Sequence, residues 1–335
     1  MTMASVRSIL GNGTAGYSES GEVAIAEPFG LVIGPDGGLF FCDLGNHRIR
    51  CWQDDAVTTV VGNGNAGNDG DGGPAVAASI IEPYELRLDA TGQLFFVDMK
   101  AHVVRKVDRD GIITTVAGTG QQGFSGDGSA AIDAQLNQPH SIEFGPDGSL
   151  YVADIANHRI RRVDLQSGRI ETFAGNGHTD ATPDGAGLAS VALNGPRAIA
   201  FDSHGDMILA LREGNALHRI DMRDRTIHHI AGNGRFGWEG DGGDARLARL
   251  AGPKGIALSQ AGDIYLADTE SHTIRRIDSV RNVITTVLGN GTENDGPDGD
   301  PLTCSLARPH GVHVDASDNV WIGDSDNHRI RVLSH

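Results

Sequence analysis

The stretch that decides the fold is Pro139-His-Ser-Ile-Glu-Phe-Gly-Pro-Asp-Gly-Ser-Leu-Tyr-Val-Ala-Asp154, followed by Ile155-Ala-Asn-His-Arg-Ile-Arg-Arg-Val-Asp164. It predicts a short strand, a Pro-Asp-Gly turn, a second strand ending in Asp, a tight turn and a third strand. A regular period of this length indicates a repeat architecture. Related units begin at a proline every 55 to 57 residues, at Pro28, Pro83, Pro139, Pro196, Pro253 and Pro309.

Each unit predicts a four-stranded antiparallel sheet. The second strand, as in Leu150-Tyr-Val-Ala153, is apolar throughout, as expected when both of its faces are covered. The third, as in Arg159-Ile-Arg-Arg-Val163, alternates, which predicts that one face lies in water. A fourth strand, clearest in Ile113-Thr-Thr-Val-Ala-Gly-Thr-Gly120, ends in Gly-x-Gly. Four antiparallel strands repeated radially predict a β-propeller blade.

The number of units predicts how the propeller closes. A fourth strand ends at Gly11, before any first strand, and the last proline-led unit ends at His335 without a fourth strand. The N-terminal strand, Val6-Arg-Ser-Ile-Leu10, should therefore complete the last blade and remove an open sheet edge. We predict an all-β, six-bladed propeller, with four antiparallel strands per blade, as a single domain over residues 1–335.

Composition excludes several classes of function. The formal net charge of −17 disfavours nucleic acid as a partner, because phosphate contacts need dense Lys and Arg. No apolar run is long enough for a membrane span, and the N-terminus lacks a secretory signature, so a cytoplasmic location is expected. Cys42, Cys51 and Cys304 suggest neither a disulfide framework nor a zinc ribbon. Without a G-x-S-x-G elbow, acyl-enzyme chemistry is unsupported, and without a P-loop or a dinucleotide fingerprint, no nucleotide cofactor is expected.

The repeated motif also resembles a known family. Gly-Phe124-Ser-Gly-Asp-Gly, then Pro-x-x-Ile, then Tyr-Val-Ala-Asp-x-x-Asn-His-Arg-Ile-Arg-Arg, is similar to the NHL repeat, and the resemblance extends over essentially the whole chain. It implies an NHL-type six-bladed propeller. Members of that family include interaction scaffolds, sensor domains and some enzymes, so the fold alone does not choose a function. The function must come from positions at which the copies differ.

The first such positions face the predicted central channel. With a period of two, the third and fifth residues after each proline face the neighbouring blades, so the second and fourth face the channel. Four of these channel positions are ionisable, namely Glu85, Arg87, Glu143 and His313, and the others are mostly small. They either form functional groups or fill the channel as Glu–Arg pairs together with water.

The residue directly after each proline should lie at the channel mouth, on the face that carries the long loops. It differs in almost every blade: Phe29, Tyr84, His140, Arg197, Lys254 and His310. In blade 4, Leu211 also replaces an aspartate found in the other blades, and Arg212 follows it. On an acidic protein, this basic arc predicts a site for a carboxylate or another anion. The alternative is that these cations pair with carboxylates of the protein itself.

Two mouth residues suggest a metal. His140 in Pro-His-Ser-Ile and His310 in Pro-His-Gly-Val are similar to the zinc-ligand histidines of peptidylhydroxyglycine-amidating lyases, which share the NHL propeller fold. The resemblance implies a divalent metal, zinc or calcium, held by His140 and His310, with Tyr84 as a catalytic phenol. That family uses three histidines, and no third blade has one in this slot; Glu143 or His313 could complete the set.

Two further patterns have a structural and a functional interpretation. The recurring Asp and His, such as Asp154 with His158, are too uniform for a catalytic pair, and we expect Asp to bond backbone N–H groups. The long loops carry Tyr17, Phe124 and Trp238 in one aligned slot. These aromatics either roof a substrate pocket or pin their own loops.

Two functions remain. The first is a lyase or hydrolase for a small anionic substrate. Its acid, base or metal-ligand groups would be His140, His310, Tyr84, Glu85 and Glu143, with His313 as a further ligand. Its substrate contacts would be Arg197, Arg212, Lys254, Arg87, Phe29, Phe124 and Trp238. The second is a non-catalytic module that binds a peptide or protein on the same face. Because the repeats fill the chain, the enzyme is favoured.

Overall fold

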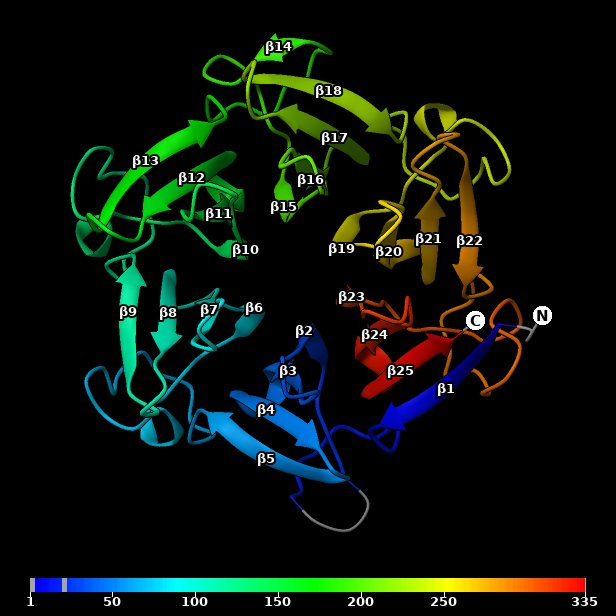
Figure 1. Ribbon diagram of the computed structural model, residues 1–335. Coiled ribbons are helices and arrows are strands. Elements are labelled where there is room, and N and C mark those ends of the chain that lie inside the picture. Colours follow the sequence, from blue (N-terminus) through cyan, green and yellow to red (C-terminus); the bar gives the residue numbers. More distant parts are fainter. Residues whose placement is uncertain (1–3, 20–22, 335) are drawn as a thin grey trace.

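Six antiparallel sheets surround a central axis in the computed structural model, which describes residues 4–19 and 23–334 (Figure 1). The innermost strands of blades 1 to 6 are β2 (Pro28–Ile33), β6 (Pro83–Leu88), β10 (Pro139–Phe144), β15 (Pro196–Phe201), β19 (Pro253–Leu258) and β23 (Val312–Val314). The second strands are β3 (Leu39–Asp43), β7 (Leu94–Asp98), β11 (Leu150–Asp154), β16 (Met207–Leu211), β20 (Ile264–Asp268) and β24 (Val320–Asp324).

The outer strands complete each blade. The third strands are β4 (Arg48–Gln53), β8 (Val103–Val107), β12 (Arg159–Asp164), β17 (Ala216–Asp221), β21 (Thr273–Ile277) and β25 (Arg329–Ser334). The fourth strands are β5 (Ala56–Val61), β9 (Ile113–Ala117), β13 (Arg169–Ala174), β18 (Thr226–Ala231), β22 (Ile284–Leu288) and β1 (Ser5–Leu10). The prediction of a six-bladed, four-stranded propeller is confirmed. Blade 4 has an unpredicted fifth strand, β14 (Ala186–Gly187), paired with β18.

The first and last strands close the propeller as predicted. β1 pairs antiparallel with β25, with Val6 opposite Leu333, so the two ends of the chain lie together in blade 6 (Figure 1). Val6 and Leu333 are both fully buried. The pairing covers an edge that would otherwise present free N–H and C=O groups to other chains.

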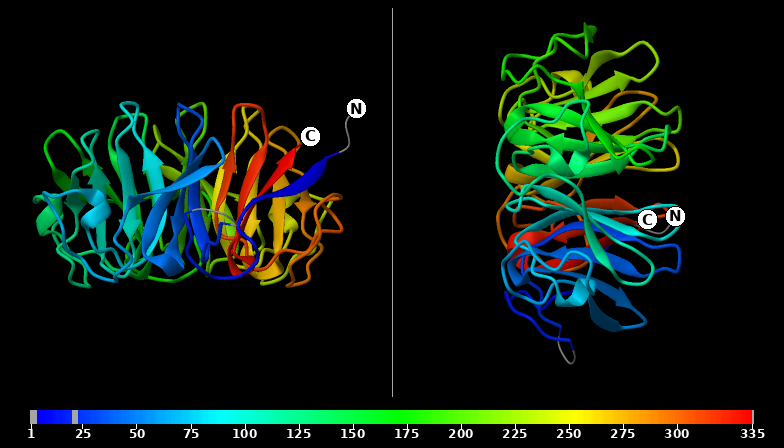
Figure 2. Two further views of the ribbon diagram at one scale, coloured as in Figure 1. Left: turned by 90° about the horizontal axis from the view of Figure 1, so that it is seen from below. Right: turned by 90° about the vertical axis from the view of Figure 1, so that its left-hand side faces the viewer.

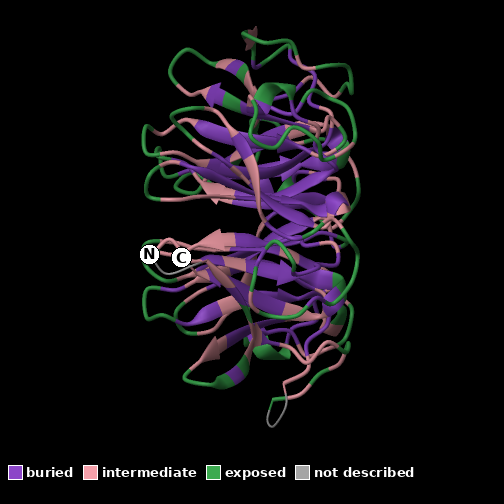
Figure 3. Cartoon of the chain, turned by 90° about the vertical axis from the view of Figure 1, so that its right-hand side faces the viewer, coloured by how far each residue is buried: buried purple, intermediate pink, exposed green. Residues whose placement is uncertain are grey.

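The core lies between neighbouring blades. Ile142 and Ile199, third after their prolines, are fully buried, and one cluster joins Ile199 and Leu209 of blade 4 to Tyr151 and Phe173 of blade 3. Buried residues follow the strands and exposed residues the loops (Figure 3). Seen edge-on, the blades stand side by side with loops above and below (Figure 2). Because strands alternate in direction, the links from second to third strands and from each blade to the next share one face, here called the loop face.

The recurring Asp residues are structural, as expected. Asp154 is fully buried, accepts the Asn137 N–H at 2.7 Å and accepts the Asn157 amide at 2.7 Å. His158 adopts a left-handed conformation (φ 54°) after the short helix η4 (Ile155–Asn157). Similar three-residue helices are η1 (Leu44–Asn46), η2 (Ala75–Ala77), η3 (Ala131–Asp133), η5 (Ala245–Leu247), η6 (Thr269–Ser271) and η7 (Ser325–Asn327). None of the helices in the described residues could cross a membrane.

The prediction of a wet basic face on the third strands is wrong for five arginines. They are at most 1% exposed: Arg50, Arg105, Arg161, Arg275 and Arg331. In blade 3, the preceding long loop folds over β12, and its Asp127 carboxylate lies 2.7 Å from the Arg161 guanidinium. The Ser125 carbonyl oxygen accepts a second bond at 3.1 Å. A guanidinium paired with a carboxylate can be buried in this way, even though Nε of Arg161 has no partner among the described residues, whereas burying an unpaired guanidinium carries a large cost.

Candidate functional site

The six residues that follow the prolines meet on the axis. In blades 2 to 5 the strand register shifts at this residue, which therefore has no partner on the second strand. In blade 3, for example, Pro139 pairs with Asp154 and Ser141 pairs with Ala153, so His140 between them is unpaired. Such a bulge re-aims a side chain. We call this set the axial ring: Phe29, Tyr84, His140, Arg197, Lys254 and His310.

The axial ring is a packed layer. The Phe29 and Tyr84 rings stack with centroids 4.6 Å apart. His310 packs on Phe29 at 3.9 Å, and His140 packs on Tyr84 at 4.5 Å. Five of the six residues are buried, and Tyr84 is half-buried. The sequence prediction brought these residues together correctly, but it did not anticipate that they would cover one another.

Arg197 is the ring member whose polar groups are not satisfied. It is 2% exposed, and its guanidinium carbon lies 4.6 Å from the Tyr84 ring centroid. Its Nε and Nη1 have no hydrogen-bond partner among the described residues. Burial lowers the pKa of Arg197, but a guanidinium remains charged in proteins. Each unsatisfied buried donor costs roughly 1–3 kcal/mol.

The other cations of the predicted clamp have carboxylate partners. Lys254 Nζ lies 2.9 Å from Glu270 Oε1, and the guanidinium of the half-buried Arg212 lies 2.7 Å from Glu213 Oε1. Burial lowers the pKa of Lys254 to about 8. Lys254 and Arg212 therefore pair with carboxylates of the protein itself, as the alternative predicts. Arg197 differs from them, because its Nε and Nη1 have no partner among the described residues.

Both ring histidines are neutral. His140 Nδ1 lies 2.7 Å from the Gln138 carbonyl oxygen, and His310 Nδ1 lies 2.8 Å from that of Arg308. Burial lowers the pKa of each well below its ordinary value; Arg197 adds to the effect at His140, and Lys254 adds to it at His310. With Nδ1 protonated and donating to a carbonyl, Nε2 is the basic atom of each ring.

This donor set does not suit a cation. The described residues contain no group of three or more His, Cys, Asp or Glu arranged to hold a metal ion. The ammonium of Lys254 lies 3.1 Å from His310 Nε2, the atom that a metal would need. His140 lies close enough to Arg197 for that charge to depress its pKa. We therefore derive no metal-dependent step, and the predicted zinc or calcium ion stays a prediction.

The ionisable channel residues form a separate layer. Arg87 bridges Glu85 and Glu143, at 2.7 Å from each carboxylate, so its charge is balanced within the protein. Arg87, Glu143 and His313 line a cavity of about 360 Å³ between the later halves of the innermost strands, away from the loop face. Burial lowers the pKa of His313 to about 4. The two ion pairs of Arg87 match the alternative in which Glu–Arg pairs fill the channel.

The loop aromatics pack on their own blades. Phe124 lies 3.9 Å from the Arg159 guanidinium carbon, and Tyr17 lies 4.1 Å from that of Arg48. Trp238 covers the backbone at Gly291, where an added Cβ would be 2.7 Å from its ring. These contacts match the interpretation in which the aromatics pin their loops. The structure does not bring Phe124 or Trp238 into the axial ring.

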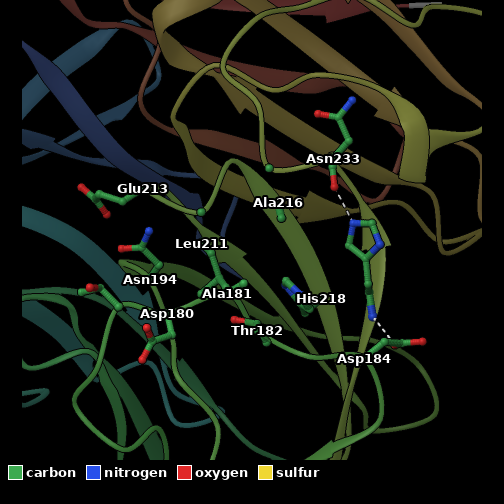
Figure 4. Close-up of a pocket in the computed structure, with 15 residues that line it drawn as sticks. Asp180, Ala181, Thr182, Asp184, Asn194, Leu211, Glu213, Ala216, His218 and Asn233 are labelled. Carbon is green, nitrogen blue, oxygen red and sulfur yellow. Dashed lines mark hydrogen bonds between the residues drawn. The ribbon is translucent and has the colours of Figure 1, made fainter.

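Sequence reasoning missed a pocket of about 450 Å³ in blade 4, on the loop face (Figure 4). Leu211, His218, His229 and Asp184 are among its lining residues. The available signal was Leu211, which interrupts the aspartate pattern, together with His218 at the position of the buried arginines. The alternation of the third strand predicts a solvent-exposed face for those arginines, so a histidine in their place does not indicate a pocket from sequence alone.

Comparison with known proteins places this geometry in a family. Residues 57–122, 120–164 and 236–307 match the model of the Teneurin NHL domain, and residues 306–333 match that of the NHL repeat. The chain belongs to the NHL-repeat propeller family. NHL repeat-containing protein 2 of Bos taurus is 26% identical over 332 residues, which cover 88% of this chain and 44% of the relative. The chain thus spans less than half of that NHL protein, so its length does not separate an enzyme from a binding module.

Solved structures share the overall fold of this chain. A structural genomics protein of unknown function from Bacteroides thetaiotaomicron has a TM-score of 0.73 at 15% identity, covering 99% of this chain and 76% of that one. A virginiamycin B lyase from Staphylococcus aureus has a TM-score of 0.59 at 14% identity, covering 99% and 100%. Similarity at this identity extends to the fold, which serves enzymes and non-enzymes alike.

Proposed function

We propose that the chain binds a small carboxylate-bearing ligand at the axial ring, with Arg197 as the principal donor. The observation that carries the proposal is the buried guanidinium of Arg197, whose Nε and Nη1 have no partner among the described residues. A ligand carboxylate could accept a charge-assisted hydrogen bond from Nε or from Nη1, and because these two groups lie on different edges of the guanidinium plane, each could take its own acceptor. Lys254, held by Glu270, would add a second positive charge nearby.

Tyr84 would control access to this site. It packs on Arg197, His140 and Phe29 and is the half-buried member of an otherwise buried ring. Ligand entry would require the phenol to rotate away from the guanidinium. The ligand would then replace a cation–π contact by charge-assisted hydrogen bonds, which are the stronger interaction in a desolvated site.

A lyase or hydrolase is the second candidate, and the state of His140 favours it. Its ring is neutral, and its basic Nε2 belongs to the layer that contains Arg197. A base so placed could remove a proton from the carbon next to a bound carboxylate, while Arg197 stabilises the charge that develops on the carboxylate oxygens. The virginiamycin B lyase shows that this fold accommodates a lyase.

Titration calorimetry with acetate, succinate, benzoate and a peptide with a free C-terminal carboxylate tests the binding, with the matching amides as neutral controls. We expect carboxylates to bind and amides not to bind. Arg197→Met should abolish the heat, and Arg212→Met, at an arginine that already pairs with Glu213, should keep it. Full carboxylate affinity in Arg197→Met would refute the proposal. The peptide arm separates a small metabolite from a protein terminus.

The catalytic candidate has its own test. Deuterium exchange at the carbon next to the carboxylate of a bound ligand should be measurable in the parent protein and lost in His140→Gln, with ligand affinity unchanged. Exchange that persists in His140→Gln would leave binding as the function and remove His140 as the base.

A further inference from the structure

Blade 4 differs from the other five blades at one register position. In those blades a buried arginine of the third strand faces Thr or Ser of the fourth: Arg50 and Thr59, Arg105 and Thr115, Arg161 and Thr172, Arg275 and Thr286, and Arg331 and Ser8. In blade 4 the pair is His218 and His229. Leu211 also replaces the aspartate that ends the second strand elsewhere. The blade has therefore lost its buried arginine and one of the carboxylates beside it.

The pocket of about 450 Å³ in blade 4 is lined by His218, at the position of that arginine (Figure 4). The surrounding loop has not collapsed into it. Asp184 still accepts the His229 N–H at 2.9 Å, as Asp241 accepts that of Thr286 at 2.9 Å in blade 5. The small side chain of Ala181 also lines the pocket, at the slot where blade 3 has Phe124 stacked over its arginines.

Asp184 thus occupies the place of a guanidinium acceptor without a guanidinium. The matching Asp127 and Asp241 lie 2.7 Å and 2.6 Å from their arginines. Their side chains are 46% and 44% exposed, whereas that of Asp184 is 70% exposed. Its neighbour in blade 4 is the His228 ring, 3.7 Å away.

His218 supplies a second, independent sign of a missing ligand. It is 3% exposed, and its Nδ1 has no hydrogen-bond partner among the described residues. It lines the pocket, and burial lowers its pKa to about 4, so the ring is neutral at physiological pH. Asp180, Asp184 and Glu213 also line the pocket, and its lining includes no Lys or Arg. The electrostatics therefore favour a cation with several N–H donors.

We propose that the blade 4 pocket binds a guanidinium group, which takes the place that an arginine of the chain itself fills in the other five blades. Asp184 would accept its charged N–H groups, and the unpaired Nδ1 of His218 would provide a neutral contact deeper in the pocket. The guanidinium belongs either to a small molecule or to an arginine side chain of a peptide. This cation site is separate from the anion site proposed at Arg197.

Titration calorimetry with agmatine and N-acetyl-arginine amide tests the proposal, with N-acetyl-citrulline amide as the uncharged isostere. Both guanidinium probes should bind, and N-acetyl-citrulline amide should bind at least about tenfold more weakly, because its neutral urea group cannot form charge-assisted bonds. Tighter binding of agmatine would indicate a small molecule, and tighter binding of the amide would indicate an arginine side chain. No binding of either guanidinium probe would overturn the proposal.

His218→Arg is the decisive variant, because it restores the residue of the other blades and fills the pocket from within. It should remove guanidinium binding while its carboxylate response at Arg197, or its far-ultraviolet dichroism, shows that it is folded. Asp184→Asn should weaken binding about tenfold by removing one charged acceptor. Should His218→Arg fail to fold, His218→Phe fills the same space without charge. Unchanged guanidinium affinity in the folded filling variant would contradict the proposal.

Discussion

Blades 3 and 4 share four strands in the same order, and blade 4 adds the short β14, yet the two blades differ at one interior position of the third strand. Blade 3 buries Arg161 and holds it with Asp127 from its own loop. Blade 4 places His218 there and keeps an open pocket beside Asp184. At the axis the contrast reverses, because blade 3 offers the neutral His140, whereas blade 4 offers the unsatisfied Arg197. The two proposed sites therefore share one feature, which is a charged group, Asp184 or Arg197, without an ion-pair partner of the kind that Asp127 and Lys254 have.

The largest expected effect comes from giving blade 3 the histidine of blade 4. Arg161→His would leave Asp154 buried without its guanidinium, 3.5 Å away in the parent protein, and should destabilise the fold by roughly 3–5 kcal/mol in urea unfolding. Adding Asp154→Leu, which reproduces the Leu211–His218 pair, should recover much of the loss. If the single and double variants are equally stable, the buried ion pair is not what separates the two blades.

At the axis, Arg197→Met should stabilise the unliganded protein by about 1–3 kcal/mol, since it removes buried N–H groups that lack partners. Chemical denaturation without ligand measures this, and His140→Met in blade 3 is the matched substitution. His140 donates to the Gln138 carbonyl, so its replacement should destabilise. A loss of stability in Arg197→Met would mean that the guanidinium is satisfied within the fold.

A smaller effect is expected at the loop slot. Phe124→Ala removes a ring 3.9 Å from Arg159 and should cost about 0.5–1 kcal/mol in urea unfolding. The corresponding residue of blade 4 is Ala181, so Ala181→Phe should stabilise only when His218→Arg supplies a guanidinium to stack on. A double-mutant cycle over these two sites measures the coupling, and additive effects would contradict it.

The smallest effect is a pH dependence of carboxylate binding. Burial lowers the pKa of Lys254 to about 8, so its ammonium loses its proton as the pH rises through that value. Affinity should be constant below about pH 7 and fall about threefold by pH 9, because Lys254 already has Glu270 as partner. Lys254→Met should show no such step. If carboxylate affinity fell more between pH 7 and pH 9 than it falls in Arg197→Met, Lys254 of blade 5, and not Arg197 of blade 4, would be the main carboxylate-binding residue.

The titration of Lys254 also changes the stability of the fold, but in the opposite direction: stability rises with pH, whereas carboxylate affinity falls. Because the folded pKa of Lys254 lies below its ordinary value, burying the ammonium costs stability at neutral pH. That cost is relieved as the pH rises from about 8 toward the unfolded pKa of roughly 10.4. Unfolding measured across this window in the parent and in Lys254→Met isolates the contribution of Lys254.

The sequence by itself determined the architecture and the membership of the axial ring. The period of the prolines, the Pro-Asp-Gly turns and the alternation in the first strands are local signals, and they predicted six blades, closure by β1 and the six residues that meet at the axis. These signals suffice because turn chemistry and strand period act over a few residues.

Only the tertiary structure decided which charged side chains have an ion-pair or hydrogen-bond partner. Arg161 and Asp127 lie 34 residues apart, and the alternation of the third strand suggested water on a face that the loop covers. The same holds at the axis, where Glu270 pairs with Lys254 and no described group pairs with Nε or Nη1 of Arg197. A cavity such as the blade 4 pocket arises from a side chain that is missing, so it becomes visible only when the surrounding residues have been placed.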